Sequence, residues 1–312
     1  MGKIALVFPG QGAQAVGMGR DVFDNVPAAR DIFDAADREL GFKLTELMFD
    51  GPDTELKQTI NTQPALLTTS YALYKALQQH EIQPDFVAGH SLGEYSALVV
   101  AGVMSFADAV SIVRKRGQFM EEAVPFGQGA MAAVLAADRT QLGALCDDIS
   151  SLTDTATVQL ANVNCPGQIV ISGTVEGVQA VAERGKEAGA KRVKLLEVSG
   201  PFHSTLMKPA AERLSKELLE VSMRDASIPI VANVTARAEQ QADAIRNLLV
   251  EQVYSPVLWE DSVRYMIDQG VDTFIEIGSG SVLSGLIKKI DNSVRIVTIN
   301  SLAAVESFKL ES

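Results

Sequence analysis

Short runs of apolar residues alternate along the chain with longer segments in which apolar residues recur at helical spacing. The apolar runs predict buried strands at residues 4–8, 86–88, 228–232 and 273–277. The periodic segments predict helices at residues 21–40, 64–79, 106–122 and 208–219, with Pro64 at the start of its helix. Buried strands separated by helices are typical of a mostly parallel sheet with helices on both faces. We therefore expect a large α/β domain.

The segment between residues 127 and 197 follows a different order of elements. It predicts a strand, a helix, two strands around a Cys-Pro-Gly turn, a second helix and a last strand, at residues 130–135, 138–149, 158–164, 168–172, 175–188 and 192–198. This βαββαβ order is that of a ferredoxin-like unit. We predict a small ferredoxin-like domain at 127–197, inserted into a large catalytic domain formed by residues 1–126 and 198–312.

Composition and charge narrow the function classes. The 312 residues carry 27 Lys and Arg against 39 Asp and Glu, a net charge of −12. This excess of acid disfavours binding to nucleic acid or to an anionic membrane. Cys146 and Cys165 do not have the spacing of a zinc site or a disulfide framework, and the apolar run near the N-terminus is too short for a membrane span. We expect a soluble cytoplasmic protein without a metal, a nucleic-acid partner or a membrane partner.

The pentapeptide Gly-His-Ser-Leu-Gly at residues 89–93 follows one predicted strand and precedes a helical segment. A G-x-S-x-G sequence between a strand and a helix is typical of the nucleophile elbow of α/β-hydrolase-like domains, where a sharp turn exposes the serine hydroxyl. Ser91 would then be a nucleophile, and the N–H of Leu92 would face a developing oxyanion. The alternative interpretation is a tight turn with a capping serine.

A nucleophilic serine needs a base, and the chain has three histidines. His80 ends a polar helix and is predicted to be a solvated surface residue. His90 lies inside the elbow, where its side chain either points away from Ser91 or lines the site. His203 follows a predicted strand in a Pro-containing loop, and by elimination it is the candidate base. No Asp or Glu stands out as the third member of a triad, and a backbone carbonyl could orient the ring instead.

Arg116 lies on the apolar row of the helix predicted at 106–122. A buried guanidinium stays charged and therefore needs an anion. One interpretation is a structural ion pair with an internal Asp or Glu; the other is a clamp that binds a substrate carboxylate through two hydrogen bonds. A serine nucleophile together with such a clamp would indicate an acyl group with a free acid at its far end.

The glycine-rich segment at residues 10–15 (GQGAQA) follows the first predicted strand and matches G-x-G-x-x-A. In a dinucleotide-binding fold one helix should lead to a second strand that ends in an acidic residue, about 20 residues further on. Here residues 21–40 remain helical, and Pro9 interrupts the step from strand to loop. We therefore disfavour dinucleotide binding and interpret the N–H of Gln11 as a second oxyanion donor.

Several segments along the whole chain resemble the malonyl-CoA:acyl carrier protein transacylase family of fatty acid and polyketide synthesis. They are residues 8–12 (FPGQG), 63–65 (QPA), 89–94 (GHSLGE), 162–168 (NVNCPGQ), 202–204 (FHS), 252–259 (QVYSPVLW) and 276–283 (EIGSGSVL). Ser279 stands where proline is common in this family. Arg116 falls where the family places its carboxylate-binding arginine.

This resemblance implies a ping-pong transfer of malonyl from malonyl-CoA to the phosphopantetheine thiol of acyl carrier protein, through a malonyl-serine intermediate. It implies Ser91 and His203 as catalytic residues, Gln11 and Leu92 as the oxyanion hole, Gln252 as the residue whose carbonyl orients the histidine, and Arg116, Gln63, Asn162 and Phe202 as substrate-binding residues. For Asn162 a plain polar strand-end residue is an equal alternative. The bulk of Phe202 favours malonyl over methylmalonyl. No permanently bound cofactor is implied, since malonyl-CoA is a substrate.

Four basic residues form a cluster in the predicted small domain of this acidic chain, namely Lys186, Lys191, Arg192 and Lys194. One interpretation is a solvated face, and the other is a docking patch for an acidic carrier protein. We expect a monomer. The remaining alternatives for the activity are acyl transfer with a different acyl specificity, as in polyketide synthesis, and a serine esterase.

Overall fold

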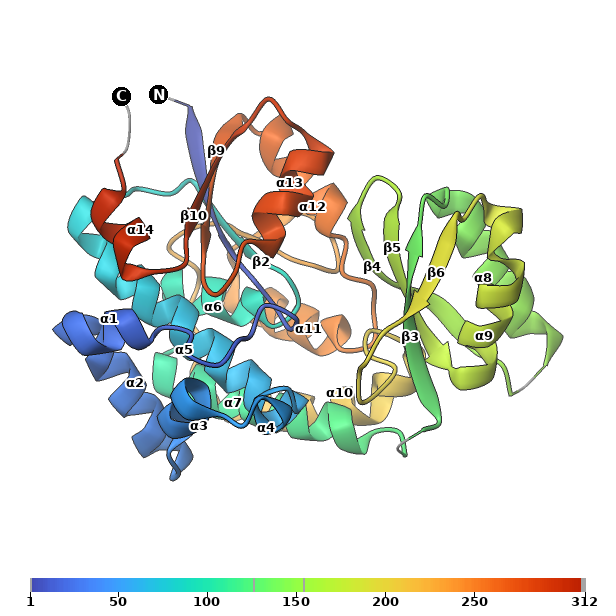
Figure 1. Ribbon diagram of the computed structural model, residues 1–312, viewed down its shortest axis with the longest axis horizontal. Helices are drawn as coiled ribbons and strands as arrows, with labels where there is room; N and C mark the ends of the chain where they lie inside the picture. Colours follow the sequence, from blue (N-terminus) through green and yellow to red (C-terminus); the bar gives the residue numbers. More distant parts are fainter. Residues whose placement is uncertain (1, 126, 154, 310–312) are drawn as a thin grey trace.

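The structure, a computed structural model, describes residues 2–125, 127–153 and 155–309. A six-stranded sheet lies at the centre of its larger lobe (Figure 1), in the order β10 (Arg295–Ile299), β9 (Val271–Ile277), β1 (Lys3–Phe8), β2 (Phe86–Gly89), β7 (Ile230–Val231) and β8 (Ala238–Glu239). Its strand pairs are parallel except β7 with β8. The expected parallel-rich sheet of a mixed α/β protein is therefore present. Residue 126, which ends the first segment of the predicted large domain, lies outside the described residues.

Alternate residues of β1 contribute to two apolar cores on opposite faces of this sheet. Leu6 and Phe8 pack into one core, whereas Ala5 and Val7 pack into the other. In chain order, the helices among the described residues of this lobe are α1 (Arg20–Asn25), α2 (Pro27–Leu40), α3 (Leu44–Asp50), α4 (Asp53–Leu56), α5 (Thr59–Leu77), η1 (Gln78–His80), α6 (Gly93–Val100), α7 (Phe106–Glu122), η3 (Thr205–Met207), α10 (Lys208–Leu219), α11 (Ala242–Gln252), α12 (Trp259–Asp268), α13 (Val282–Ile290) and α14 (Leu302–Ser307). Burial on both faces explains why residues 4–8 of β1 and all of β2 are apolar apart from the glycine that ends β2.

A second sheet forms the smaller lobe, on the right of Figure 1. It is antiparallel, in the order β4 (Val158–Cys165), β5 (Gln168–Thr174), β3 (Gly129–Leu135) and β6 (Arg192–Leu195). The helices α8 (Arg139–Leu152) and α9 (Val175–Arg184), followed by η2 (Gly185–Ala188), pack with it around a separate apolar core. Among the described residues, no helix in either lobe is long and apolar enough to cross a membrane.

Strand β4 joins the two lobes. The N–H of Val163 donates to the carbonyl of Val257 at 2.9 Å, and the N–H of Val257 donates to the carbonyl of Ala161 at 2.8 Å. The side chain of Gln159 accepts from the N–H of Thr205 at 2.9 Å. The small lobe is therefore hydrogen-bonded to loops at the carboxyl end of the large sheet, which is the edge where open α/β sheets bind ligands.

Two helix predictions are wrong in their details. The helix predicted at 21–40 is divided into α1 and α2, because Val26 is extended (φ −118°) and Pro27 begins a new helix. Pro64 lies inside α5, which begins at Thr59. A carboxylate of α7 explains the earlier start: Glu121 accepts the N–H of Thr59 at 2.7 Å, and a sequence pattern does not reveal such a tertiary cap.

The prediction that His80 is a solvated surface residue is only partly correct, because His80 is half-buried. Its Nε2 lies 2.9 Å from the carbonyl oxygen of Val305, and its ring packs edge-on against Phe308. The C-terminal helix α14 packs against α5, so residues more than 200 positions apart in the sequence cover this histidine.

Candidate active site

The predicted elbow lies between β2 and α6, at the carboxyl end of the large sheet. Ser91 has a left-handed backbone conformation with φ +50°, which is unfavourable for a residue with a side chain. A Cβ atom on Gly93 would lie 2.0 Å from the carbonyl oxygen of Phe8, and one on Gly10 would lie 2.3 Å from that of His90. Glycine at both positions therefore lets the first glycine-rich loop pack directly on the elbow, which brings Gln11 beside Ser91 in one cavity.

Ser91, His203 and Gln252 form a hydrogen-bonded chain. The Oγ of Ser91 lies 2.8 Å from Nε2 of His203, and Nδ1 of His203 lies 2.8 Å from the carbonyl oxygen of Gln252. Because a carbonyl only accepts, Nδ1 carries the proton and Nε2 is free to accept one from the serine. Burial, followed by the positive charge of Arg116, lowers the pKa of His203 to about 3. The imidazole is therefore neutral near pH 7, as a general base must be.

Arg116 projects from α7 into the same site and is 2% exposed. Its Nη1 donates to Oε1 of Gln63 at 2.8 Å, and its Nη2 donates to Oε1 of Gln252 at 2.9 Å and to Oγ of Ser91 at 3.1 Å. Within the described part of the chain, Nε of Arg116 has no hydrogen-bond partner, and no carboxylate lies within ion-pair distance. A buried guanidinium with neutral partners and a spare donor can still accept a carboxylate.

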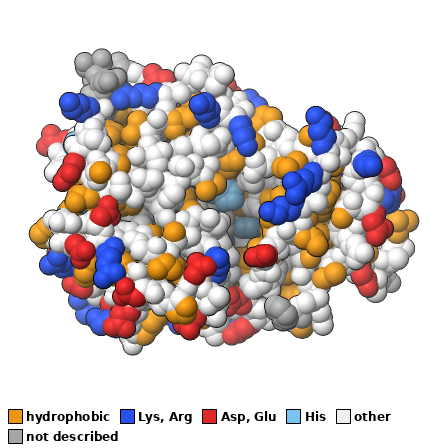
Figure 2. All heavy atoms as spheres, in the orientation of Figure 1, with side chains coloured by type: hydrophobic (Ala, Val, Ile, Leu, Met, Phe, Trp, Pro, Cys, Tyr) orange, Lys and Arg blue, Asp and Glu red, His pale blue; other side chains and the backbone are white. Residues whose placement is uncertain are grey.

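These groups line a cavity of about 130 Å³ between the two lobes. Its walls also contain the oxyanion candidates, two of the substrate candidates and several apolar side chains. The residues that line it are Gln11, His90, Ser91, Leu92, Arg116, Met120, Met131, Asn162, Leu196, Val198, Phe202 and His203. Figure 2 shows histidine side chains at the bottom of a hollow between the lobes. The structure thus brings together the predicted nucleophile, base, cation and Phe202, while Gln63 and Gln252 contact Arg116 from behind.

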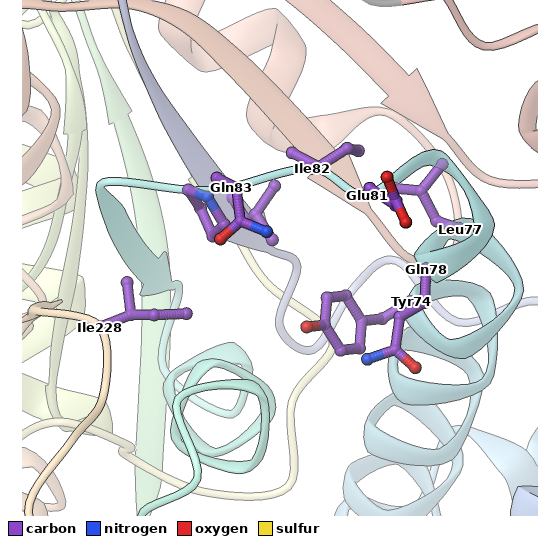
Figure 3. Close-up of a pocket in the computed structure, with 9 residues that line it drawn as sticks. Tyr74, Leu77, Gln78, Glu81, Ile82, Gln83 and Ile228 are labelled. Atoms are coloured by element: carbon purple, nitrogen blue, oxygen red, sulfur yellow. The ribbon is translucent and has the colours of Figure 1, made fainter.

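A larger hollow of about 650 Å³ lies at the opposite edge of the sheet, before the start of β2 and β7. Figure 3 shows Tyr74 of α5 and Gln78 of η1 on one side of it, the segment containing Gln83 above, and Ile228 facing them. None of the residues that line it is a histidine, serine, lysine or arginine. The smaller cavity is therefore the better candidate for the chemistry.

Two buried polar residues under the elbow carry no role in the sequence interpretation. Asn233 accepts the N–H of Ser91 through Oδ1 at 2.7 Å, and Oε2 of Glu94 accepts from the N–H of Asn233 at 3.0 Å and from Nε2 of Gln252 at 2.9 Å. Burial raises the pKa of Glu94 to about 7, although these hydrogen bonds and the charge of Arg116 oppose the shift. The sequence did contain a signal for Asn233, which directly follows the strand predicted at 228–232 and so reaches the ligand-binding edge.

His90 is hydrogen-bonded across the lobes. Its Nε2 lies 2.8 Å from Oδ1 of Asn164 on β4, its ring packs against Trp259, and burial lowers its pKa. The sequence left open whether His90 points away from Ser91 or lines the site. The structure places it in the cavity lining, with its hydrogen bond directed to the small lobe and not to Ser91. Asn162, on the same strand, is 7% exposed and also faces the cavity.

The four predicted docking residues, Lys186, Lys191, Arg192 and Lys194, are all exposed. Arg192 and Lys194 alternate along β6 with Val193, which packs toward the small core, so they point away from that core. Figure 2 shows lysine and arginine side chains on the small-lobe side of the hollow. Part of the positive charge of this acidic chain therefore lies on the small-lobe side of the hollow.

Comparison with known proteins identifies the family. The model of the acyl transferase domain matches residues 5–304. The chain belongs to this acyl transferase family. It is 53% identical over 306 residues to the malonyl CoA-acyl carrier protein transacylase of Bacillus subtilis, covering 98% of this chain and 96% of the relative.

Solved structures of similar acyl transferases have the same fold. The acyl carrier protein S-malonyltransferase of Vibrio cholerae superposes with a TM-score of 0.95 at 44% identity, over 98% of this chain and 100% of that one. A malonyl-transacylase solved in complex with a holo acyl carrier protein of a type II polyketide synthase superposes with a TM-score of 0.94 at 42% identity, over 98% of each chain.

Proposed function

We propose that this chain transfers the malonyl group of malonyl-CoA to the phosphopantetheine thiol of acyl carrier protein, through a malonyl ester on Ser91. One observation carries the proposal: a serine–histidine pair shares a small cavity with a buried guanidinium that has no carboxylate partner among the described residues. The relatives described above are malonyl transacylases by name. The malonyl-carrier product would supply fatty acid chain elongation.

The first half-reaction uses groups already in place. As Oγ of Ser91 attacks the thioester carbon, Nε2 of His203 accepts the hydroxyl proton, and the carbonyl of Gln252 supports the resulting imidazolium. The N–H groups of Gln11 and Leu92 stabilise the tetrahedral oxyanion. When the intermediate collapses, the C–S bond breaks and His203 returns the proton to the sulfur of CoA. In the second half-reaction the carrier thiol attacks the ester carbon, His203 takes its proton, and Ser91 leaves with that proton.

The acyl group is selected by its free acid and by its width. The malonyl carboxylate binds Arg116, in place of neutral oxygens such as Oγ of Ser91. Gln63 holds the guanidinium from behind. The buried ring of Phe202 leaves little room for a methyl group on the α carbon, and Asn162 contacts the pantetheine arm from β4.

The covalent intermediate gives the direct test. Mixed with malonyl-CoA alone, the protein is expected to gain the mass of one malonyl group, and peptide mapping should place it on Ser91. Ser91→Ala should gain nothing, whereas Ser293→Ala, a change in an exposed turn, should gain the same adduct. Addition of holo carrier protein should then remove the adduct and malonylate the carrier.

Other outcomes of this experiment would identify the alternatives. Release of free malonate without carrier protein, at the rate of CoA release, would indicate a serine esterase. An adduct formed faster from another acyl-CoA would indicate a different acyl specificity. No adduct on the wild-type protein would refute the proposed transfer.

We also propose that Lys186, Lys191, Arg192 and Lys194 receive the acidic carrier protein. Lys194 lies two residues before Leu196, which lines the cavity. A carrier bound at this strand would let its pantetheine arm reach Ser91 while the carrier remains outside. We propose that the enzyme works as a cytoplasmic monomer without a permanently bound cofactor. Its two buried free thiols, Cys146 and Cys165, fit a reducing compartment.

The domain organisation that we propose has a ferredoxin-like domain at residues 127–197. Residues 1–126 and 198–312 form the α/β-hydrolase-like catalytic domain around it. The order β4-β5-β3-β6, with α8 and α9 sharing one core with the sheet, supports the ferredoxin-like assignment, and the elbow after β2 supports the hydrolase-like one.

A further inference from the structure

The carboxamide of Asn233 completes the hydrogen bonding of the large sheet at the nucleophile. Strands β2 and β7 pair in parallel only at Val87 with Ile230 and at Ala88 with Val231. Beyond this point the backbone of β7 turns away, and the N–H of Ala232 donates to Arg237. The residues of the elbow consequently lie past the end of the backbone ladder.

Asn233 bonds the elbow as a strand residue would. Its Nδ2 donates to the carbonyl of Gly89 at 2.7 Å, and its Oδ1 accepts the N–H of Ser91 at 2.7 Å. In a parallel ladder one residue binds the carbonyl of residue j and the N–H of residue j+2 on its neighbour. The side chain of Asn233 reproduces this pattern with j at position 89.

The position of Asn233 is itself fixed from three sides. Its N–H donates to Oε2 of Glu94, its carbonyl accepts from the N–H of Leu258 at 2.9 Å, and its Oδ1 accepts from Nε2 of Gln252 at 3.2 Å. The residue is fully buried. Glu94 belongs to α6, the helix that begins at Gly93, so the segments on both sides of the turn are hydrogen-bonded to Asn233.

We propose that Asn233 is a positioning residue for acyl transfer, whose carboxamide holds Ser91 in its left-handed conformation. The backbone of Ser91 determines the direction of its Oγ and of the next N–H, that of Leu92. One amide therefore sets the alignment of both the nucleophile and an oxyanion donor, without touching the substrate. The inference rests on the proposed serine route.

The first test separates positioning from binding. With Asn233→Ala, the rate constant of acylation at saturating malonyl-CoA should fall about 10- to 100-fold, because small misplacements of reacting groups are costly. The dissociation constant of malonyl-CoA, compared between Ser91→Ala and the Ser91→Ala/Asn233→Ala double variant, should change by less than about twofold. Thr45→Val, which removes a different buried hydrogen bond, controls for lost stability and should acylate normally.

The second test uses the isosteric Asn233→Asp variant. An ionised carboxylate cannot donate to the carbonyl of Gly89, whereas a protonated one has an O–H that can. The ratio of variant to wild-type acylation rates should therefore rise as the pH falls from about 8 to about 5.5, since burial and nearby Glu94 favour protonation. The other charged or titratable groups of the site are Arg116, His90 and His203. They are present in both proteins, so the ratio of the two rates isolates the effect of residue 233.

The outcomes distinguish the two levels of the argument. A wild-type protein that forms no malonyl adduct would refute the proposed function and with it this inference. If the wild-type protein forms the adduct but Asn233→Ala acylates at the same rate as the wild type, only the positioning role is overturned. A loss that appears equally in binding and rate, or an Asn233→Asp ratio that does not change with pH, would also overturn it.

Discussion

Replacing Arg116 by alanine should change which thioester acylates Ser91. The guanidinium is buried, its hydrogen-bond partners are neutral, and its Nε has no partner among the described residues, so it can bind an acyl carboxylate. An acetyl group has no carboxylate and gains nothing from this cation. We expect Arg116→Ala to lose malonylation selectively, without slowing acylation by acetyl-CoA.

The magnitude follows from the contacts that are exchanged. Two hydrogen bonds between a buried guanidinium and a carboxylate contribute roughly 3–6 kcal/mol. Binding the acid costs Arg116 some of its present hydrogen bonds to Gln63, Gln252 and Ser91, at roughly 1 kcal/mol each. The net effect is about 2–4 kcal/mol, or a roughly 30- to 1000-fold fall in the malonyl-to-acetyl ratio of acylation rates.

Quench-flow acylation followed by intact-mass measurement gives this ratio directly. Arg114→Ala is a matched control on the same helix, because Arg114 contacts Asn61 and the ring of Phe42 outside the cavity. Arg116→Lys should give an intermediate ratio, since it keeps the charge but loses the two-point geometry. If Arg116→Ala leaves the malonyl-to-acetyl ratio unchanged, Arg116 does not bind the acyl acid.

Four further predictions concern pH, stability, acyl width and docking. Because the pKa of His203 is lowered to about 3, the second-order acylation rate should be flat from about pH 5 to 8; an inflection near pH 6.5 in stopped-flow traces would contradict this. The pKa of Glu94 is raised to about 7, so the folded protein holds a proton that the unfolded chain releases near pH 4.5, and it loses stability as the pH rises between these values. The Tm of Glu94→Gln minus that of the wild type should accordingly increase by about 2–6 °C between pH 4.5 and pH 8. A Tm difference that calorimetry finds to be the same at both pH values would refute the raised pKa of Glu94. Phe202→Ala should raise the methylmalonyl-to-malonyl ratio in competition assays about 10- to 100-fold, whereas an unchanged ratio would exclude steric selection by this ring. Reversing the charge of both Arg192 and Lys194 to Glu should raise the KM for carrier protein about tenfold at low salt but leave adduct formation intact, and an unchanged KM would exclude docking at this patch.

The local parts of this site were predictable from the sequence. The elbow needs only a strand, five residues and a helix, and α7 matches the predicted range of 106–122 because its apolar spacing is regular. These signals arise from residues that are close together in the sequence. They located Ser91 and placed Arg116 on a buried face.

The supporting contacts were not predictable, because they join residues far apart in the chain. Asn233 lies 142 positions from Ser91, and the side chain of Gln252 bonds Glu94 at a separation of 158. No periodicity marks such pairs; only the order of the parallel strands brings them together. The early start of α5 and the partial burial of His80 were mispredicted for the same reason, since Glu121 and Val305 act across the fold.

The hydrogen bond from Arg116 to Oγ of Ser91 restrains the nucleophile. A cation that draws on the lone pairs of the serine oxygen makes that oxygen a poorer nucleophile for as long as the contact lasts. An arriving acid competes for the same guanidinium and can relieve the serine at the moment when the thioester is beside it. A thioester without an acid leaves the restraint in place. Discrimination would then act on the rate of bond formation as well as on occupancy, so that neutral acyl-CoAs could enter the cavity and leave it unreacted.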